Sequence, residues 1–123
     1  MEHYKDAAIR HYADAMALRE NDRKDNTGHL LGFSAECAIK HEISSVSADG
    51  SSPRGHLPDF LSIARKHISK RSSMYDLLQQ NLLPGWKVER RYLATGQTTD
   101  EELDTWAKDT RRLIGAAGIK VRQ

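Results

Sequence analysis

The stretch 28-GHLLGFSAECAIK-40 combines the apolar pattern of a helix with three ionisable side chains. Small and aliphatic residues recur every three or four positions, so we predict a helix from about Thr27 to Ile43, capped by Asn26 or Thr27. Apolar residues cover more than one face of this helix, which is typical of a helix enclosed by others. Its charged side chains, Glu36 and Lys40, therefore need partners inside a helical bundle.

Four further helices follow from the same spacing and from start and stop signals. We predict them at 4–20, from Pro58 to about Lys70, from Ser72 or Ser73 to about Leu82, and from Thr99 to about Ala117. The last begins with Thr-Asp-Glu-Glu, the form of a capping box. Five helices joined by short turns predict an all-α, antiparallel bundle.

The other segments lack a helical pattern. Residues 44–53 hold five serines, a glycine and a proline, too little apolar surface to offset the entropy of ordering, so we expect a flexible loop at 44–55. Trp86–Tyr92 is predicted to be extended, with Trp86 and Val88 facing the helices. Residues 119–123 are expected to form a disordered tail.

Length and composition indicate one domain over 1–123. The chain is 38% hydrophobic and 29% charged, as in a folded, well-solvated helical protein. It has no apolar run of about 20 residues and no signal-peptide pattern, which predicts a cytoplasmic protein without a membrane partner. The one cysteine, Cys37, is expected to be a buried thiol, and neither a metal site nor a cofactor is predicted.

The charge is unevenly distributed along the chain. Residues 1–53 carry 6 basic and 9 acidic side chains, 54–92 carry 8 and 3, and 93–123 carry 5 and 5. A basic middle segment is consistent with a phosphate-bearing partner, although clusters of this size also occur as ordinary solvated surface. Both interpretations stay open at this point.

The ionisable residues of the central helix also have two interpretations. Glu36 stands four residues before Lys40, the order that favours a helical ion pair, and such a pair could lie at the edge of the core. Alternatively, this polar notch binds a phosphate or base together with His29. Gly28 and Gly32 leave a flat strip on the helix where another backbone could approach closely.

The segment after Pro84-Gly85 is the second candidate site. Alternation would direct Arg90 toward the bundle, where it would meet an acid such as Glu36 or a ligand phosphate, and Arg91 toward solvent. Tyr92 would pack its ring, and His56 would complete an anion site at a helix start. The candidate ligand-binding residues are thus Glu36, Lys40, His56, Arg90, Arg91 and Tyr92. The alternative is a salt-bridged strap that closes the bundle.

Several of these motifs together resemble the HEPN (higher eukaryotes and prokaryotes nucleotide-binding) domain family. They are GHLLGFSAECAIKHEI, then RGHLPDFLSIA, WKVERRY and TDEELDTWAKDTRRLI, in this order over nearly the whole chain. The resemblance implies an all-α bundle, commonly a homodimer, in a family that includes RNases of toxin–antitoxin systems. It also includes non-catalytic members that accompany nucleotidyltransferases.

The sequence departs from the RNase members of that family. Those carry an Arg, four to six residues and a His at or before the last helix, whereas no histidine follows His67 here. Arg23 and His29 have the spacing, but they lie between the first two predicted helices. We therefore predict a non-catalytic module that binds nucleotide, RNA or a protein partner. The alternatives are a metal-independent RNase using Arg23 and His29, and a purely structural interaction protein.

Overall fold

The computed structural model describes residues 3–120, and within them it contains five α-helices, one 3-10 helix and no β-strand. The elements are α1 (Tyr4–Glu20), α2 (Lys24–Val46), α3 (Phe60–His67), α4 (Ser73–Leu78), η1 (Val88–Tyr92) and α5 (Asp100–Ala116). The prediction of an all-α bundle with five helices is confirmed.

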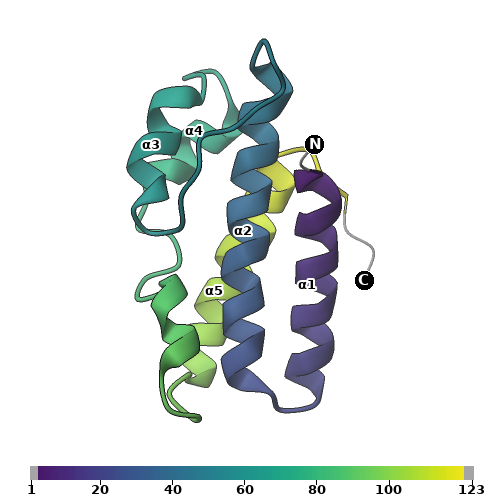
Figure 1. The fold of residues 1–123 in the computed structure, drawn as a ribbon, viewed down its shortest axis with the longest axis vertical. Coiled ribbons are helices and arrows are strands. Elements are labelled where there is room, and N and C mark those ends of the chain that lie inside the picture. Colours follow the sequence, from purple (N-terminus) through teal and green to yellow (C-terminus); the bar gives the residue numbers. More distant parts are fainter. Residues whose placement is uncertain (1–2, 121–123) are drawn as a thin grey trace.

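The long helices α1, α2 and α5 lie side by side (Figure 1). A short turn at 21–23 joins α1 to α2, so these two run in opposite directions. α5 runs in the same direction as α2: Lys24 pairs with Asp100 at the two helix starts, and farther along the Thr110 hydroxyl donates to the Leu31 carbonyl. α1 is therefore antiparallel to both of its long neighbours, whereas α2 and α5 are parallel, so the predicted antiparallel arrangement is wrong for this pair.

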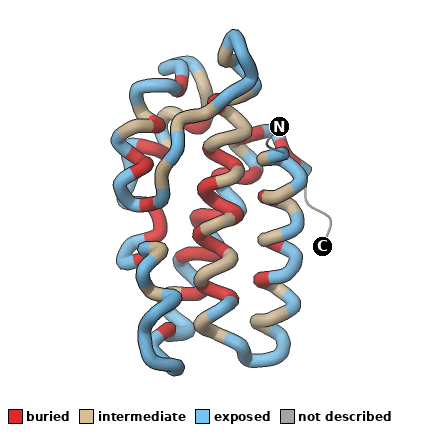
Figure 2. Tube along the Cα trace, in the orientation of Figure 1, coloured by how far each residue is buried: buried red, intermediate tan, exposed pale blue. Residues whose placement is uncertain are grey.

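The short elements cover the side of α2 that α1 leaves open. α3 and α4 lie beside the C-terminal half of α2, and η1 lies beside its N-terminal half (Figure 1). Figure 2 shows that buried residues follow α2 along most of its length, among them Leu31, Ala35 and Ile39 at 0% exposure. The prediction that this helix is the centre of the bundle is confirmed.

Two predicted helix starts are also confirmed. The Thr99 hydroxyl accepts from the Glu102 N–H at 3.1 Å, and the Glu102 carboxylate accepts from the Thr99 N–H at 3.0 Å. At α4 the Ser72 hydroxyl accepts from the Met74 N–H at 3.1 Å. In both cases a local side chain satisfies a backbone amide that the helix leaves without a partner.

The predicted ends of α2 are wrong. The helix begins at Lys24 with no side-chain cap, and the Thr27 hydroxyl donates back to the Arg23 carbonyl at 2.8 Å instead of capping. It continues through Val46, so the connecting loop begins at 47 rather than 44. The hydroxyls of Ser44 and Ser45 donate to carbonyls of their own helix, which allows serine to continue a helix.

The chain between α3 and α5 also differs from the prediction. α3 begins at Phe60 after Pro58 and ends at His67, and α4 ends at Leu78. Trp86 is buried as predicted, but residues 88–92 form a 3-10 helix instead of an extended segment. Local bonds explain this, since the Arg90 N–H donates to the Lys87 carbonyl and the Leu93 N–H to the Arg90 carbonyl.

Two further predictions fail at single residues. Ile119 is 4% exposed, and its N–H donates to the Ile114 carbonyl, so the predicted tail is wrong at this position. Residues 121–123 of that tail lie outside the described residues. Cys37 is half-buried rather than buried, and it packs against the edge of the core.

The two glycines of α2 receive indole rings rather than a backbone. A Cβ on Gly32 would lie 1.8 Å from Cε2 of Trp86, and one on Gly28 would lie 2.6 Å from Cζ3 of Trp106. The Trp86 indole N–H donates to the Gly28 carbonyl at 2.8 Å. A close approach at this strip was predicted correctly, but large side chains make it and not another backbone.

Across residues 3–120, none of the helices combines the length and the apolar character that crossing a bilayer requires.

Candidate functional site

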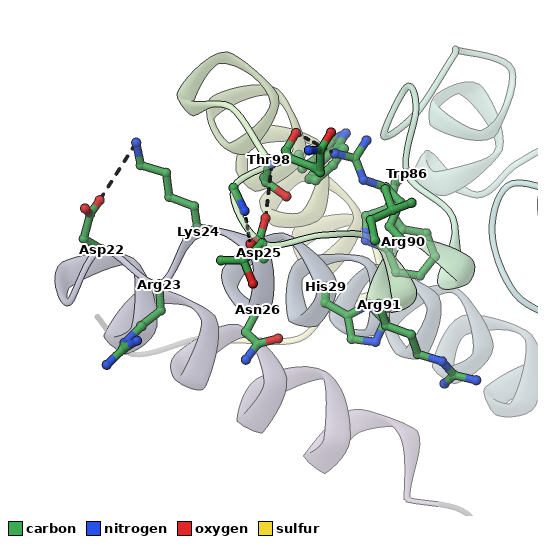
Figure 3. A pocket seen from close by; sticks show the side chains of 15 residues that line it. Asp22, Arg23, Lys24, Asp25, Asn26, His29, Trp86, Arg90, Arg91 and Thr98 are labelled. Carbon is green, nitrogen blue, oxygen red and sulfur yellow. Dashed lines mark hydrogen bonds and ion pairs between the residues drawn. The ribbon is translucent and has the colours of Figure 1, made fainter.

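An open cleft of about 540 Å³ lies where the start of α2 meets η1 and the segment before α5. Figure 3 shows side chains from these three parts of the chain around it. Four cationic and two acidic side chains contribute to its lining. The lining residues used below are Asp22, Arg23, Lys24, Asp25, Asn26, His29, Trp86, Arg90, Arg91 and Thr98.

One wall of the cleft is held by Arg90. Its guanidinium forms a bidentate pair with the Glu102 carboxylate, at 2.8 Å and 3.2 Å, and lies 4.9 Å from the centre of the Trp106 ring. It also donates to the carbonyls of Gly85 and Gln97. The prediction that Arg90 meets an acid holds, but the acid is Glu102 and not Glu36. Arg90 thus joins η1 to α5, as in the predicted salt-bridged strap.

Asp25 holds the opposite edge. Its carboxylate accepts from the N–H groups of Gly96 and Thr98 at 2.8 Å and 3.1 Å. The Gly96 hydrogen bond is the main reason why the pKa of Asp25 lies below its usual value. These two hydrogen bonds tie the 96–98 segment to the start of α2, and the lowered pKa keeps the carboxylate ionised, so its negative charge stays at this edge of the cleft.

His29 lies at the inner end of the cleft. Its ring stacks at 23° on the Trp86 ring with centroids 6.1 Å apart, and meets the edge of Phe33 at 4.5 Å. Its Nδ1 is buried without a hydrogen-bond partner among the described residues. Burial, followed by the charges of Arg91 and His56, lowers the pKa of His29 below 6.5, so the ring is neutral at pH 7.

Two arginines of the cleft differ from Arg90. Arg23 and Arg91 are exposed, and neither forms an ion pair within residues 3–120. The Arg91 guanidinium lies 4.8 Å from the centre of the Tyr92 ring. Tyr92 is 75% exposed, so the prediction that its ring packs into the bundle is wrong. The turn of η1 directs it to solvent, next to the cleft.

The other predicted ligand-binding residues lie apart from the cleft, around Glu36. This carboxylate is 3% exposed and accepts from the Leu57 N–H at 2.8 Å and from His56 Nδ1 at 3.1 Å. Burial raises the pKa of Glu36, and the hydrogen bonds from Leu57 and His56 oppose that rise. The ring of His56 therefore contacts a carboxylate, and the anion site at the start of α3 stays a prediction.

The predicted Glu36–Lys40 ion pair is not present among the described contacts. The Lys40 ammonium instead lies 5.2 Å from the centre of the Phe60 ring. The loop that returns from α2 brings His56 and Leu57 onto Glu36, and these contacts take the place of the intrahelical pair. Sequence spacing could not indicate this, because the partners are 20 and 21 residues away.

Arg23 and His29 line the same cleft, which their separation in sequence did not require. Figure 3 shows the Arg23 guanidinium pointing away from the His29 ring. Among the cleft residues, sequence reasoning missed Asp22, Lys24, Asp25, Asn26 and Thr98. The first four lie in the polar run 21–28, which could have identified them, whereas no local signal marked Thr98.

No known protein family, curated protein or solved structure gives a significant match to this chain. The resemblance to the HEPN family therefore stays a prediction, and the cleft has to be interpreted from its own chemistry.

The lowered pKa of His29 predicts a pH effect on stability. The unfolded chain binds a proton at His29 more readily than the folded protein does, so this residue favours folding above pH 6.5 and loses that contribution as the pH falls. The free energy of unfolding, measured with urea above and below pH 6.5, is expected to depend less on pH for His29→Asn than for wild type. The matched control, His3→Asn at an exposed position, should keep the wild-type dependence.

Proposed function

We propose that this chain is a non-catalytic, HEPN-like module that binds single-stranded RNA or a nucleotide in the cleft. The observation that supports this most is the charge arrangement. Asp25 is occupied by two amides and Asp22 lies 3.9 Å from Lys24, whereas Arg23 and Arg91 have no acidic partner within residues 3–120. With four cationic and two acidic side chains in its lining, the cleft keeps an excess of positive charge for a phosphate.

The neighbouring aromatic supports RNA in particular. Bases of single strands stack on exposed aromatic rings and on guanidinium planes. Tyr92 at 75% exposure offers such a ring, and Arg91 already lies over it. Leu93, 51% exposed, adds an apolar contact beside them. Trp86 is too deeply buried to take part, so Tyr92 is the residue that we assign to stacking.

Titration of a labelled single-stranded RNA tests this proposal. Arg91→Ala and Arg23→Ala should each weaken binding about fivefold and lower the slope of log K against log salt by about 0.7, as expected for one lost phosphate contact on a single strand. Tyr92→Ala should weaken it about tenfold through the lost stacking contact. The matched control is Arg10→Ala on α1, which removes the same charge outside the cleft.

Equal affinity of wild type and all three cleft variants, with each variant still folded, would refute the cleft as the binding site. A loss of the same size in Arg10→Ala would show that only net charge matters.

Metal-independent RNA cleavage is the second candidate, because Arg23 and His29 share the cleft. A neutral histidine could accept a proton from an RNA 2′-OH. The titrated RNA is therefore also examined for cleavage in EDTA. Products formed by wild type and absent with His29→Asn would favour this candidate, and intact RNA would favour the binding module.

The resemblance further implies a homodimer and a protein partner of the toxin–antitoxin or nucleotidyltransferase-associated kind. We include both in the proposal. Sedimentation velocity of the purified chain tests the first, since a monomer over the whole concentration range would contradict it.

A further inference from the structure

A second group of basic side chains lies where α3 passes into α4. Lys66, His67, Lys70 and Arg71 are all exposed, and together we call them the α3–α4 corner. They occupy six consecutive positions of the chain, with only Ile68, which is buried, and Ser69 between them. Solvent-facing positive charge is thus concentrated in one short connection.

The structure of the corner does not use this charge. None of the corner side chains forms an ion pair within the described part of the chain, 3–120. Neighbouring Arg65, in contrast, donates to the Leu78 carbonyl and ties α3 to α4. The Glu42 carboxylate, the acid that reaches this connection from α2, accepts from the Ser72 hydroxyl.

The helix dipole accounts for only part of the corner. Basic residues in the last turn of a helix are favoured by its negative end, and Lys66 and His67 occupy the last turn of α3. Lys70 and Arg71 lie beyond the end of that helix and before α4 begins. They have no helix end of their own to stabilise, so their charges are available to an external anion.

The corner and the cleft lie at opposite ends of α2. The Ser72–Glu42 hydrogen bond places the corner beside the end of α2, whereas Asn26 at its start lines the cleft. Figure 1 shows α3, α4 and η1 on the same side of α2. Sixteen residues of helix between Asn26 and Glu42 correspond to about 24 Å at 1.5 Å per residue. A stacked single strand covers that distance with about seven nucleotides at 3.4 Å each.

We infer that the α3–α4 corner is a second phosphate-binding surface, on which an RNA strand that occupies the cleft continues along the protein. This inference rests on the proposed function of the cleft. Two sites on one strand act together, because binding at the first raises the local concentration of phosphate at the second. The corner carries no Phe, Tyr or Trp, and three of its four side chains are Lys or Arg, so it would contact mainly the backbone and not the bases.

The test compares a short and a long RNA. A single strand of about five nucleotides fills only the cleft, and one of about twenty reaches the corner as well. The variant Lys66→Ala/Lys70→Ala/Arg71→Ala removes three corner charges. The matched control, Lys5→Ala/Arg10→Ala/Lys108→Ala, removes three exposed charges on α1 and α5, outside both sites. Circular dichroism checks that both variants stay folded.

We expect the corner variant to bind the long RNA about tenfold more weakly, with a salt slope lower by about two, and to bind the short RNA as wild type does. The control variant should bind both RNAs almost normally. An equal loss for both RNAs, or an equal loss in the control variant, would overturn the inference. A third outcome would also overturn it: the corner variant binds RNA as wild type does but no longer binds vesicles that contain anionic lipid. The corner would then be a membrane-binding surface.

Failure of the cleft gives a different result. If Arg23→Ala, Arg91→Ala and Tyr92→Ala all leave the short RNA bound normally, the proposed function is wrong at its own site. The inference that the corner continues the cleft would then also be wrong, even if the corner variant bound the long RNA more weakly.

Discussion

Gly32→Ala is expected to destabilise the protein by about 3 kcal/mol, one of the largest effects of any small substitution in this chain. The added methyl group would lie 1.8 Å from Cε2 and 2.1 Å from Cζ2 of Trp86. The indole has no room to retreat, because it is 2% exposed and its N–H is bonded to the Gly28 carbonyl at 2.8 Å. Urea unfolding followed by circular dichroism measures the loss.

The control for this substitution is Gly115→Ala in α5. Nothing lies within 4 Å of the position that its Cβ would take. Alanine is a better helix former than glycine, so this variant should be more stable than wild type by about 0.5 kcal/mol. Similar stabilities for Gly32→Ala and wild type would show that Trp86 is not held against α2 as described.

Glu36→Ala is expected to cost about 2 kcal/mol, because it removes the acceptor of the buried Leu57 N–H. It also releases His56, and with it the end of the loop that leads into α3. Lys40→Ala should cost less than about 1 kcal/mol, since Lys40 contributes a half-buried contact with the Phe60 ring and no ion pair with Glu36. Equal losses of stability in the two variants would instead support an ion pair between Glu36 and Lys40.

Glu36→Gln separates the hydrogen bond from the charge. The side-chain oxygen of glutamine can still accept from Leu57, so this variant should lose much less stability than Glu36→Ala. The raised pKa of Glu36 means that its favourable contribution is complete below the unfolded value of 4.5 and is lost as the pH rises through the folded value. His56 and Lys40 are the charged partners that limit this loss.

The measurement is the difference in unfolding free energy between Glu36→Gln and wild type from pH 4.5 upward. The difference should move in favour of glutamine as the pH rises. A constant difference over this range would mean that burial does not perturb Glu36. His11 and His29, whose pKa values are lowered mainly by burial, affect both proteins alike and cancel in the comparison.

Local signals in the sequence determined most of the helices. Periodic apolar residues predicted α1, α2 and α5, and the capping box at Thr99 predicted the start of α5 to the residue. These features depend on residues three or four positions apart, so the local sequence is enough to predict them. The central position of α2 followed as well, because a helix that is apolar on several faces has to be enclosed.

Contacts across the chain were beyond such signals. Glu36 could be seen to need a partner, and Lys40 at four residues was the nearest choice, but the loop supplied His56 and Leu57. Arg90 likewise required an acid, and Glu102 was available only once α5 had packed beside η1. Sequence states which groups cannot be buried alone, whereas the packing of distant elements decides which partner reaches them.

The cleft shows the same division. The sequence by itself determined that the middle of the chain is basic and that Arg23 and His29 are close to each other along the chain. Only the tertiary structure divided the basic residues between the cleft and the α3–α4 corner, paired Arg90 and left Arg91 exposed. The physical reason is that charge belongs to each residue, while the presence or absence of a counter-charge depends on which elements pack together.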